Sequence, residues 1–230
     1  MKLENISFPF PDIRDAELEK VLEACAAKVY IPAKSVFIQP TETFQSVYYI
    51  HSGSTRHYMT SPDGIEKILY VLSPGWIFGE PWFFMGAPTG LYTNAETDVE
   101  LWKISYKQFD RLLDENRLFR DLVYQGLTYK VLFLRHEIAS LCFNSCQERL
   151  MRTICMSVDQ TKVIDGKWYG LKIQYTHYDL GVLIGSVRVT VSKLINKLCD
   201  EGFIRLVNRR IQVHIERYNE YMDCFFDQYQ

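Results

Sequence analysis

Short runs of β-branched and aromatic residues, broken by turn-forming residues, dominate the chain from about residue 29 to residue 105. The breaks are specific turn sequences, at Ser52-Gly53-Ser54, Ser61-Pro62-Asp63-Gly64 and Ser73-Pro74-Gly75. Closely spaced runs of this kind predict the short strands of an antiparallel barrel or sandwich. The strands that we expect are Ser35–Ile38, Val47–His51, Thr55–Thr60, Lys67–Leu72 and Glu100–Ile104.

After Ser105 the hydrophobic period becomes helical. We predict a short helix over Tyr106–Leu113 and a long one over Arg117–Phe143, which contains no Pro and one Gly. Two apolar stripes run along the long helix. The first stripe holds Leu122, Tyr129, Leu132, His136, Ala139 and Phe143, and the second holds Phe119, Val123, Leu127, Val131, Leu134, Ile138 and Leu141.

A helix that is apolar on two faces must bury both of them. One face would pack on the predicted barrel, and the economical partner for the other is the same helix of a second copy. Burial of the whole helix within one chain is the alternative. We therefore expect a homodimer joined through residues 116–143.

The last third of the chain has the order of a winged helix-turn-helix. Ser145-x-x-Glu148 and Thr176-x-x-Asp179 are capping boxes that predict the starts of two helices, and Gly185 breaks the second of these. Helix, Gly turn, helix and two-stranded wing then follow one another. The expected elements are helices Gln147–Val158, Tyr178–Ile184 and Val187–Leu198, closed by Glu201-Gly202, a turn region with one short strand over Lys162–Lys172, strands Phe203–Val207 and Ile211–Ile215 joined by Asn208-Arg209-Arg210, and a final helix within Tyr218–Tyr229.

The outer face of the helix Val187–Leu198 has the side chains that a recognition helix uses. An Arg can bridge guanine O6 and N7 or a phosphate, a Val can touch a thymine methyl, and Ser or Lys can hold phosphates. A solvated amphipathic helix is the alternative, but it does not explain the order of capping box, Gly turn and wing. We expect DNA contacts from Thr176, Ser186, Arg188, Val189, Thr190, Ser192, Lys193, Lys197, Arg209 and Arg210.

The net charge of the predicted DNA-binding segment differs from that of the whole chain. The net charge of the 230-residue chain is −2, which by itself argues against a nucleic-acid partner. The segment from Lys172 to Arg217, however, contains eight basic and four acidic side chains, so its net charge is +4. No apolar run approaches the roughly 20 residues that span a bilayer, and the N-terminus lacks a signal-peptide core. We expect a soluble, cytoplasmic protein with no membrane partner.

Four motifs stand out besides the helix-turn-helix: Tyr48-Tyr-Ile-x-Ser-Gly53, Pro62-Asp-Gly64, Leu72-Ser-Pro-Gly-Trp-Ile-Phe-Gly-Glu80 and Ile104-Ser-Tyr-Lys-Gln-Phe109. Together with the helix-turn-helix they resemble the Crp–Fnr superfamily of bacterial transcription regulators. The resemblance implies an α+β protein with an effector-binding antiparallel β-roll of the jelly-roll type over residues 1–115. It also implies a dimerisation helix over residues 116–143 and a winged helix-turn-helix over residues 144–230 that reads a pseudo-palindrome in double-stranded DNA.

Departures from the family pattern narrow the choice of effector. In members that respond to cyclic AMP, an Arg-Ser pair follows the Gly-Glu by about ten residues and holds the cyclic phosphate. Here Gly79-Glu80 is present, but the matching stretch is Thr89-Gly90-Leu91, and no Lys or Arg occurs between Lys67 and Lys103. A buried phosphate would lack a cationic partner, so we expect another effector. Cys25 alone does not replace the cysteine cluster of iron–sulfur members, and we expect no cofactor.

The same stretch is rich in aromatic side chains, which favours an apolar or aromatic effector held by a few polar groups. Core packing is the alternative for any one ring. The residues that we expect at the effector are Gly79, Glu80, Trp82, Tyr92, Tyr129 and Lys130.

The recognition helix also departs from the family. Many members have Glu after the Arg, whereas Val189 stands here, which predicts an A·T-rich half-site. The run Val189-Thr-Val-Ser192 resembles regulators of reductive dehalogenation, which respond to chlorinated aromatics. If the protein activates transcription, it must also contact RNA polymerase.

Two other readings remain open. The first is a constitutive DNA-binding dimer whose β-roll is only a scaffold. The second is a cupin-like enzyme, which would need a metal cluster that His51 and His57 do not supply.

Overall fold

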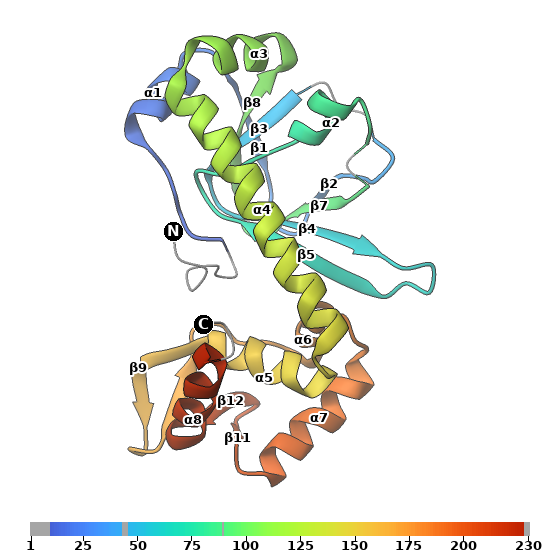
Figure 1. The fold of residues 1–230 in the computed structure, drawn as a ribbon, viewed down its shortest axis with the longest axis vertical. Helices are drawn as coiled ribbons and strands as arrows, with labels where there is room; N and C mark the ends of the chain where they lie inside the picture. The colour runs from blue at the N-terminus through green and yellow to red at the C-terminus, as the bar shows by residue number, and fades with distance from the viewer. Residues whose placement is uncertain (1–9, 43–45, 89, 228–230) are drawn as a thin grey trace. The chain divides into compact units, whose positions relative to one another are not determined.

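The computed structural model describes residues 10–42, 46–88 and 90–227 (Figure 1). The chain divides into two compact units, one formed by residues 1–60 and 68–137 and the other by residues 61–67 and 138–230. No helix in the described part of the chain is long and apolar enough to cross a membrane.

The first unit is an antiparallel β-roll of two four-stranded sheets. The five predicted strands are confirmed, with ends that shift by a residue or two, and three further strands were not predicted separately. One sheet has the order β1 (Ala27–Ile31), β8 (Val99–Ser105), β3 (Ser46–Ser52), β6 (Ile77–Phe78), and the other has the order β2 (Val36–Ile38), β7 (Tyr92–Ala95), β4 (Thr55–Thr60), β5 (Glu66–Leu72).

Four helices accompany the β-roll. The long helix α4 spans Arg117–Phe143, as predicted, and α3 spans Tyr106–Glu115 behind a capping box at Ser105. Two short helices were not predicted, α1 (Ala16–Glu23) and α2 (Glu80–Met85). Short helices of this kind span only about two turns, too few for a helical period to emerge from the sequence.

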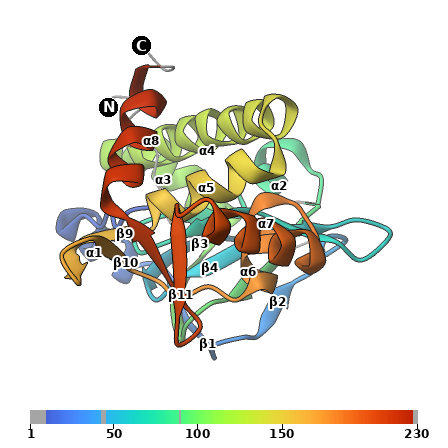
Figure 2. The same cartoon turned by 90° about the horizontal axis from the view of Figure 1, so that it is seen from below.

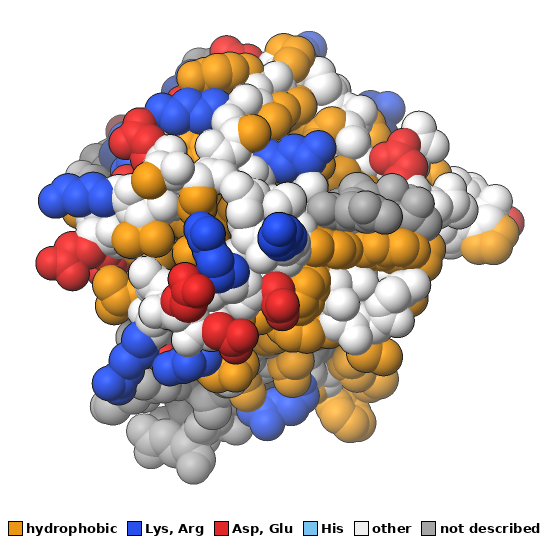
Figure 3. Space-filling view, turned by 90° about the horizontal axis from the view of Figure 1, so that it is seen from above, with side chains coloured by type: hydrophobic (Ala, Val, Ile, Leu, Met, Phe, Trp, Pro, Cys, Tyr) orange, Lys and Arg blue, Asp and Glu red, His pale blue; other side chains and the backbone are white. Residues whose placement is uncertain are grey.

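Helix α4 buries one face against the β-roll, and that face draws on both predicted stripes. Leu122 and Tyr129 of the first stripe are buried, as are Phe119 and Val123 of the second and Phe133, which belongs to neither. The division into two separately buried stripes was therefore wrong, because at about 100° per residue the buried face lies between the two stripes and takes only some members of each. Other members of the second stripe stay exposed, namely Val131, Ile138 and Leu141. On the face drawn in Figure 3, hydrophobic side chains lie at the surface among charges of both signs.

The second unit is a winged helix-turn-helix (Figure 2). Its core joins Leu150 and Ile154 to Leu180, Val191 and Ile195. The unit contains α5 (Cys146–Met156), β9 (Val158–Ile164), β10 (Trp168–Leu171), α6 (His177–Ile184), α7 (Arg188–Asp200), β11 (Ile204–Val207), β12 (Arg210–His214) and α8 (Ile215–Asp227), and its sheet has the order β11-β12-β10-β9.

Two details of the second unit correct the sequence prediction. The region Lys162–Lys172 is part of a two-stranded hairpin rather than a turn region with one strand, because the chain reverses tightly at Asp165-Gly166, where both φ angles are positive. The last helix begins at Ile215, earlier than predicted. Its expected end at Tyr229 lies outside the described residues.

The buried face of α4 gives a stability prediction. Phe119 is fully buried and its ring lies 5.4 Å from that of Phe109. Phe119→Ala should lower the free energy of unfolding by about 3–5 kcal/mol, since it removes apolar contacts and leaves a cavity. Met85→Ala, at a side chain that is 77% exposed, should change it by less than about 0.5 kcal/mol. Chemical denaturation followed by circular dichroism measures both, and equal losses would contradict the assignment of this core.

Candidate functional site

The helix-turn-helix is held by local hydrogen bonds that the sequence predicted. The Thr176 side chain accepts from the Asp179 amide at 3.1 Å, and the Asp179 carboxylate accepts from the Thr176 amide at 2.8 Å. Helix α6 ends at Gly185, which has a φ of 65°. The Ser186 amide then donates to the Gly181 carbonyl at 2.8 Å. A Cβ on Gly181 would lie 2.7 Å from the Ser186 carbonyl oxygen, so the turn passes too close for any other residue.

The outer face of α7 is exposed. Its N-cap residue, Val187, makes no side-chain capping bond, so the first amides of the helix remain available to a phosphate. Arg188 and Lys193 are exposed, and Val189 is 65% exposed. The opposite face is buried through Val191, Ile195 and Leu198. An exposed apolar side chain between two cations suits contact with a thymine methyl beside phosphates.

Four of the predicted DNA contacts are engaged within the protein. The Ser186 hydroxyl accepts from the Cys146 thiol at 4.0 Å. Thr176 serves the α6 capping box, and Lys197 donates to the Gln147 side chain at 2.7 Å. The Ser192 hydroxyl donates to the Arg188 carbonyl at 3.1 Å and lies 2.8 Å from Nδ1 of His177. His177 was not predicted, because nothing local in the sequence links it to a residue fifteen positions away.

The wing places its two arginines at the tip of the β11–β12 hairpin. Asn208 and Arg209 both have positive φ angles, which makes a tight turn, and Arg209 and Arg210 are exposed. Arg205 has a different role, because it bonds Asp165 at 2.5 Å and its guanidinium lies 4.6 Å from the centre of the Trp168 ring. Arg205 therefore ties the wing to the neighbouring β9–β10 hairpin.

Inside the β-roll lies a small cavity of about 70 Å³. Gly79, with a φ of 98°, caps the start of α2 and directs Glu80 inward, where it is fully buried. Lys130 reaches the same place from α4 and forms an ion pair with Glu80 Oε1. The cavity is lined by Ile38, His57, Tyr70, Phe78, Gly79, Glu80, Pro81, Leu91, Thr93, Leu127 and Lys130.

The buried pair determines the charge of this cavity. Burial, and then the nearby Lys130 ammonium, lower the pKa of His57 well below its usual range, so His57 is neutral. Its ring nitrogens lie 3.0 Å and 3.1 Å from the hydroxyl oxygens of Thr55 and Thr93. Among the lining residues only Glu80 and Lys130 are charged, and their charges cancel. Glu80 Oε2 is buried without a hydrogen-bond partner among the described residues.

The structure brings together three of the six residues expected at the effector. Gly79, Glu80 and Lys130 line the cavity, whereas Trp82 and Tyr92 do not. Tyr92 instead stacks on Tyr58, with 5.2 Å between the ring centres. Sequence reasoning missed His57, Tyr70 and Thr93 as lining residues, since they come from three different strands. Thr89, which we aligned with the phosphate-binding pair of the family, lies outside the described residues.

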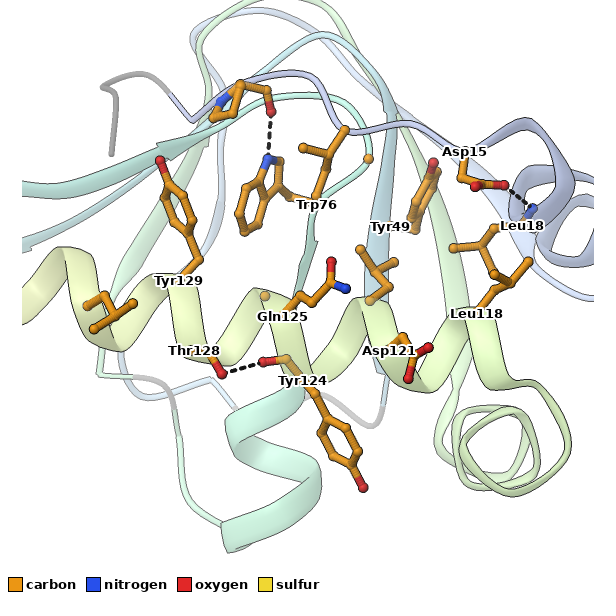
Figure 4. A pocket seen from close by; sticks show the side chains of 16 residues that line it. Asp15, Leu18, Tyr49, Trp76, Leu118, Asp121, Tyr124, Gln125, Thr128 and Tyr129 are labelled. Carbon is orange, nitrogen blue, oxygen red and sulfur yellow. Dashed lines mark hydrogen bonds between the residues drawn. The ribbon is translucent and has the colours of Figure 1, made fainter. Parts of the chain in front are cut away.

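Tyr129, the remaining expected residue, lies elsewhere. It lines a larger open groove of about 820 Å³ between α4, the chain before α1 and the segment around Trp76 (Figure 4). The indole nitrogen of Trp76 donates to the Pro11 carbonyl at 2.7 Å, which fixes one wall. The Tyr124 side chain points away from Trp76 in this view. Tyr129 therefore packs between the groove and the core rather than in the cavity with Glu80.

The described cysteines differ in burial. Cys155 is buried, which raises the pKa of its thiol to about 12, whereas Cys142 is exposed. Cys25, Cys146 and Cys199 are half-buried. Among the described residues no three His, Cys, Asp or Glu side chains form a group that could hold a metal ion.

Family comparisons agree with both units. A model of the cyclic nucleotide-binding domain matches residues 28–116, and a model of the Crp-like helix-turn-helix domain matches residues 148–217. The chain belongs to the Crp–Fnr family. Members of this family are DNA-binding transcription regulators rather than enzymes, so the cupin-like enzyme is excluded. The predicted fold class is confirmed as well.

Individual relatives are similar over most of their length. The cAMP-activated global transcriptional regulator CRP of Haemophilus influenzae is 27% identical over 202 residues, which cover 87% of this chain and 89% of that protein. The c-di-GMP responsive global regulator CLP of Xanthomonas campestris has a similar fold, with a TM-score of 0.74, 22% identity and coverage of 86% and 99% of the two chains. CprK complexed with OCPA gives a TM-score of 0.68 at 19% identity, covering 90% and 96%.

The close approach at Gly181 gives a second prediction. Gly181→Ala should force the turn before α7 to shift, lower the stability of the DNA-binding unit by about 1–3 kcal/mol and weaken DNA binding. Gly126→Ala is the matched control, because Gly126 lies within α4 and its added Cβ would meet nothing within 4 Å. That change should stabilise the helix by about 0.5–1 kcal/mol. Thermal unfolding of both variants tests the contrast, and a stable Gly181→Ala protein would refute it.

Proposed function

We propose that the protein is a homodimeric transcription regulator that reads an A·T-rich pseudo-palindrome and is controlled through its β-roll. The observation that supports this most strongly is the exposed face of α7, with Arg188, Val189 and Lys193 beside an uncapped helix start. Arg188 would bond a guanine or a phosphate, Val189 would contact a thymine methyl, and Lys193 would hold a phosphate. Arg209 and Arg210 would contact the flanking backbone.

The exposed stripe of α4 supports the dimer. Tyr124, Val131 and Ile138 follow one another at intervals of seven residues and are 58%, 64% and 61% exposed. Apolar side chains at this interval are typical of a helix that packs along a second helix. Two copies joined along α4 would present two α7 helices to half-sites about one helical turn of DNA apart. If the dimer activates transcription, RNA polymerase would be a further partner.

The charge balance of the cavity supports an effector other than a cyclic nucleotide. α4 brings a cation, Lys130, into the β-roll, but Glu80 already neutralises it. A cyclic phosphate would therefore meet no spare positive charge, whereas an uncharged apolar or aromatic molecule would not need one. Such an effector can regulate DNA binding only if its affinity differs between the states of the dimer that bind DNA strongly and weakly.

A second candidate is a regulator that binds DNA without any effector. The cavity of about 70 Å³ favours it, since pockets for drug-sized ligands usually measure roughly 300–1,000 Å³. A DNA selection with the purified protein, run with and without candidate uncharged aromatic compounds, tests both candidates. Enrichment of a palindrome only with ligand supports the first, and equal enrichment without ligand supports the second. No enriched half-site in either arm would contradict the proposed function.

Base readout by α7 gives a third prediction. Arg188→Ala should weaken binding to the selected operator by about 1–3 kcal/mol and relax the preference at one base pair, because the side chain is a specific donor. Arg117→Ala removes an equally charged side chain that is 85% exposed at the start of α4 and should leave both properties unchanged. Fluorescence anisotropy on operators with single substitutions measures the two effects. Unchanged affinity and preference in Arg188→Ala would remove Arg188 from the readout.

The neutral cavity gives a fourth prediction. Titration calorimetry with cyclic AMP should show no saturable binding, because Lys130 is already paired and no second cation lines the described cavity. The same titration with a CRP that does bind cyclic AMP serves as the positive control. A micromolar dissociation constant for this protein would overturn the rejection of cyclic AMP.

A further inference from the structure

The ion pair between Lys130 and Glu80 joins the long helix to the β-roll at one buried point. The two side chains are 10% and 1% exposed. The Lys130 ammonium also donates to the Ile77 carbonyl at 2.8 Å, so a single α4 side chain is bonded both to β6 and to the start of α2. Ile77 and Glu80 lie 53 and 50 positions before Lys130 in the sequence.

The surroundings of the ion pair disfavour its replacement by contacts of each charged group with water. The Tyr70 ring lies 5.9 Å from the Lys130 ammonium, and Phe78 and Leu127 line the same cavity. In such a setting neither charge can be left alone, because an unpaired ion in an apolar interior has a large desolvation penalty. Loss of either partner is therefore costly, and the pair favours one register of α4 on the β-roll.

The cavity beside the pair is the place from which an effector would connect the β-roll to α4. It lies between Glu80 at the start of α2 and Leu127 and Lys130 of α4. A ligand there would need a cationic or donor group for Glu80 and contact with α4. Lys130 supplies both from within the chain, and only about 70 Å³ remains open.

We propose that Lys130 acts as a built-in ligand of the β-roll, so that its bonds to Glu80 and Ile77 hold α4 in the DNA-binding arrangement without an effector. This inference rests on the second candidate function, a dimeric regulator that binds DNA without an effector. Lys130 is then a positioning residue: it does not touch DNA, and it sets the state of the helix that carries the dimer contact. Compounds that bind would act by displacing Lys130 and would lower the affinity for DNA.

The test compares how strongly full-length variants bind the operator found in the DNA selection. Native mass spectrometry first shows that each purified protein carries no small molecule. Wild-type protein should bind fully, and addition of cyclic AMP or cyclic di-GMP should not raise its affinity. Lys130→Met should weaken binding at least about fivefold, the lower end of common allosteric couplings. Lys107→Met, at an exposed lysine on α3, should bind like wild type.

A single substitution leaves Glu80 unpaired and could unfold the β-roll, so a second variant is needed. Glu80→Leu combined with Lys130→Leu removes both charges, and such apolar replacements often preserve stability. This folded double variant should also bind the operator at least about fivefold more weakly. Hydrogen exchange at the amides of residues 131–134 should become faster in it, because α4 loses its bonds to β6 and α2.

The possible results separate the two proposals. If no half-site is enriched, the proposed function fails, and the exchange rates alone decide whether Lys130 holds α4. If a half-site is enriched but the double variant binds it like wild type, with unchanged exchange, the role of Lys130 is refuted and the proposed function stands. A wild-type affinity that rises tenfold or more with an added nucleotide would also refute the role of Lys130.

Discussion

The burial of one face of α4 against the β-roll is the constraint on which the rest of the structure depends. This helix has 27 residues, and each residue turns it by about 100°. Once Phe119, Val123 and Phe133 face the core, the remaining directions are fixed. Lys130 must point into the cavity and Val131 must point outward. The core contact, the ion pair with Glu80 and the exposed stripe are thus three consequences of a single rotational setting of the helix.

The DNA-binding unit shows how internal hydrogen bonds limit the residues that remain for recognition. Thr176, Ser192 and Lys197 are polar and lie near the helix-turn-helix surface, yet each already has a partner within the protein. A side chain that holds its own helix in place loses hydrogen bonds if it turns to DNA. In the proposed complex, base readout would therefore fall to Arg188 and Val189 with Lys193 on a phosphate, while the engaged residues maintain the helix-turn-helix.

Much of the fold was predictable because it depends on local chemistry. The capping boxes at Ser145 and Thr176 and the break at Gly185 use residues within a few positions of one another, and all three are as predicted. The short helix α2 and the second strand of the β9–β10 hairpin were missed, since their local signals are weak. The two-stripe interpretation of α4 failed because hydrophobicity alone does not say which of two apolar faces a sheet will cover.

The sequence by itself determined the order of the five predicted strands and of the helices after Ser105, the winged helix-turn-helix and the family, because these follow from residues close together in the chain. Only the tertiary structure decided that Lys130 neutralises Glu80 from 50 residues away. It also decided that His57, Tyr70 and Thr93 line the cavity in place of Trp82 and Tyr92. The reason is geometric: strand register sets which of two alternating faces a side chain occupies, and the rotation of a helix sets which side chain enters a cavity.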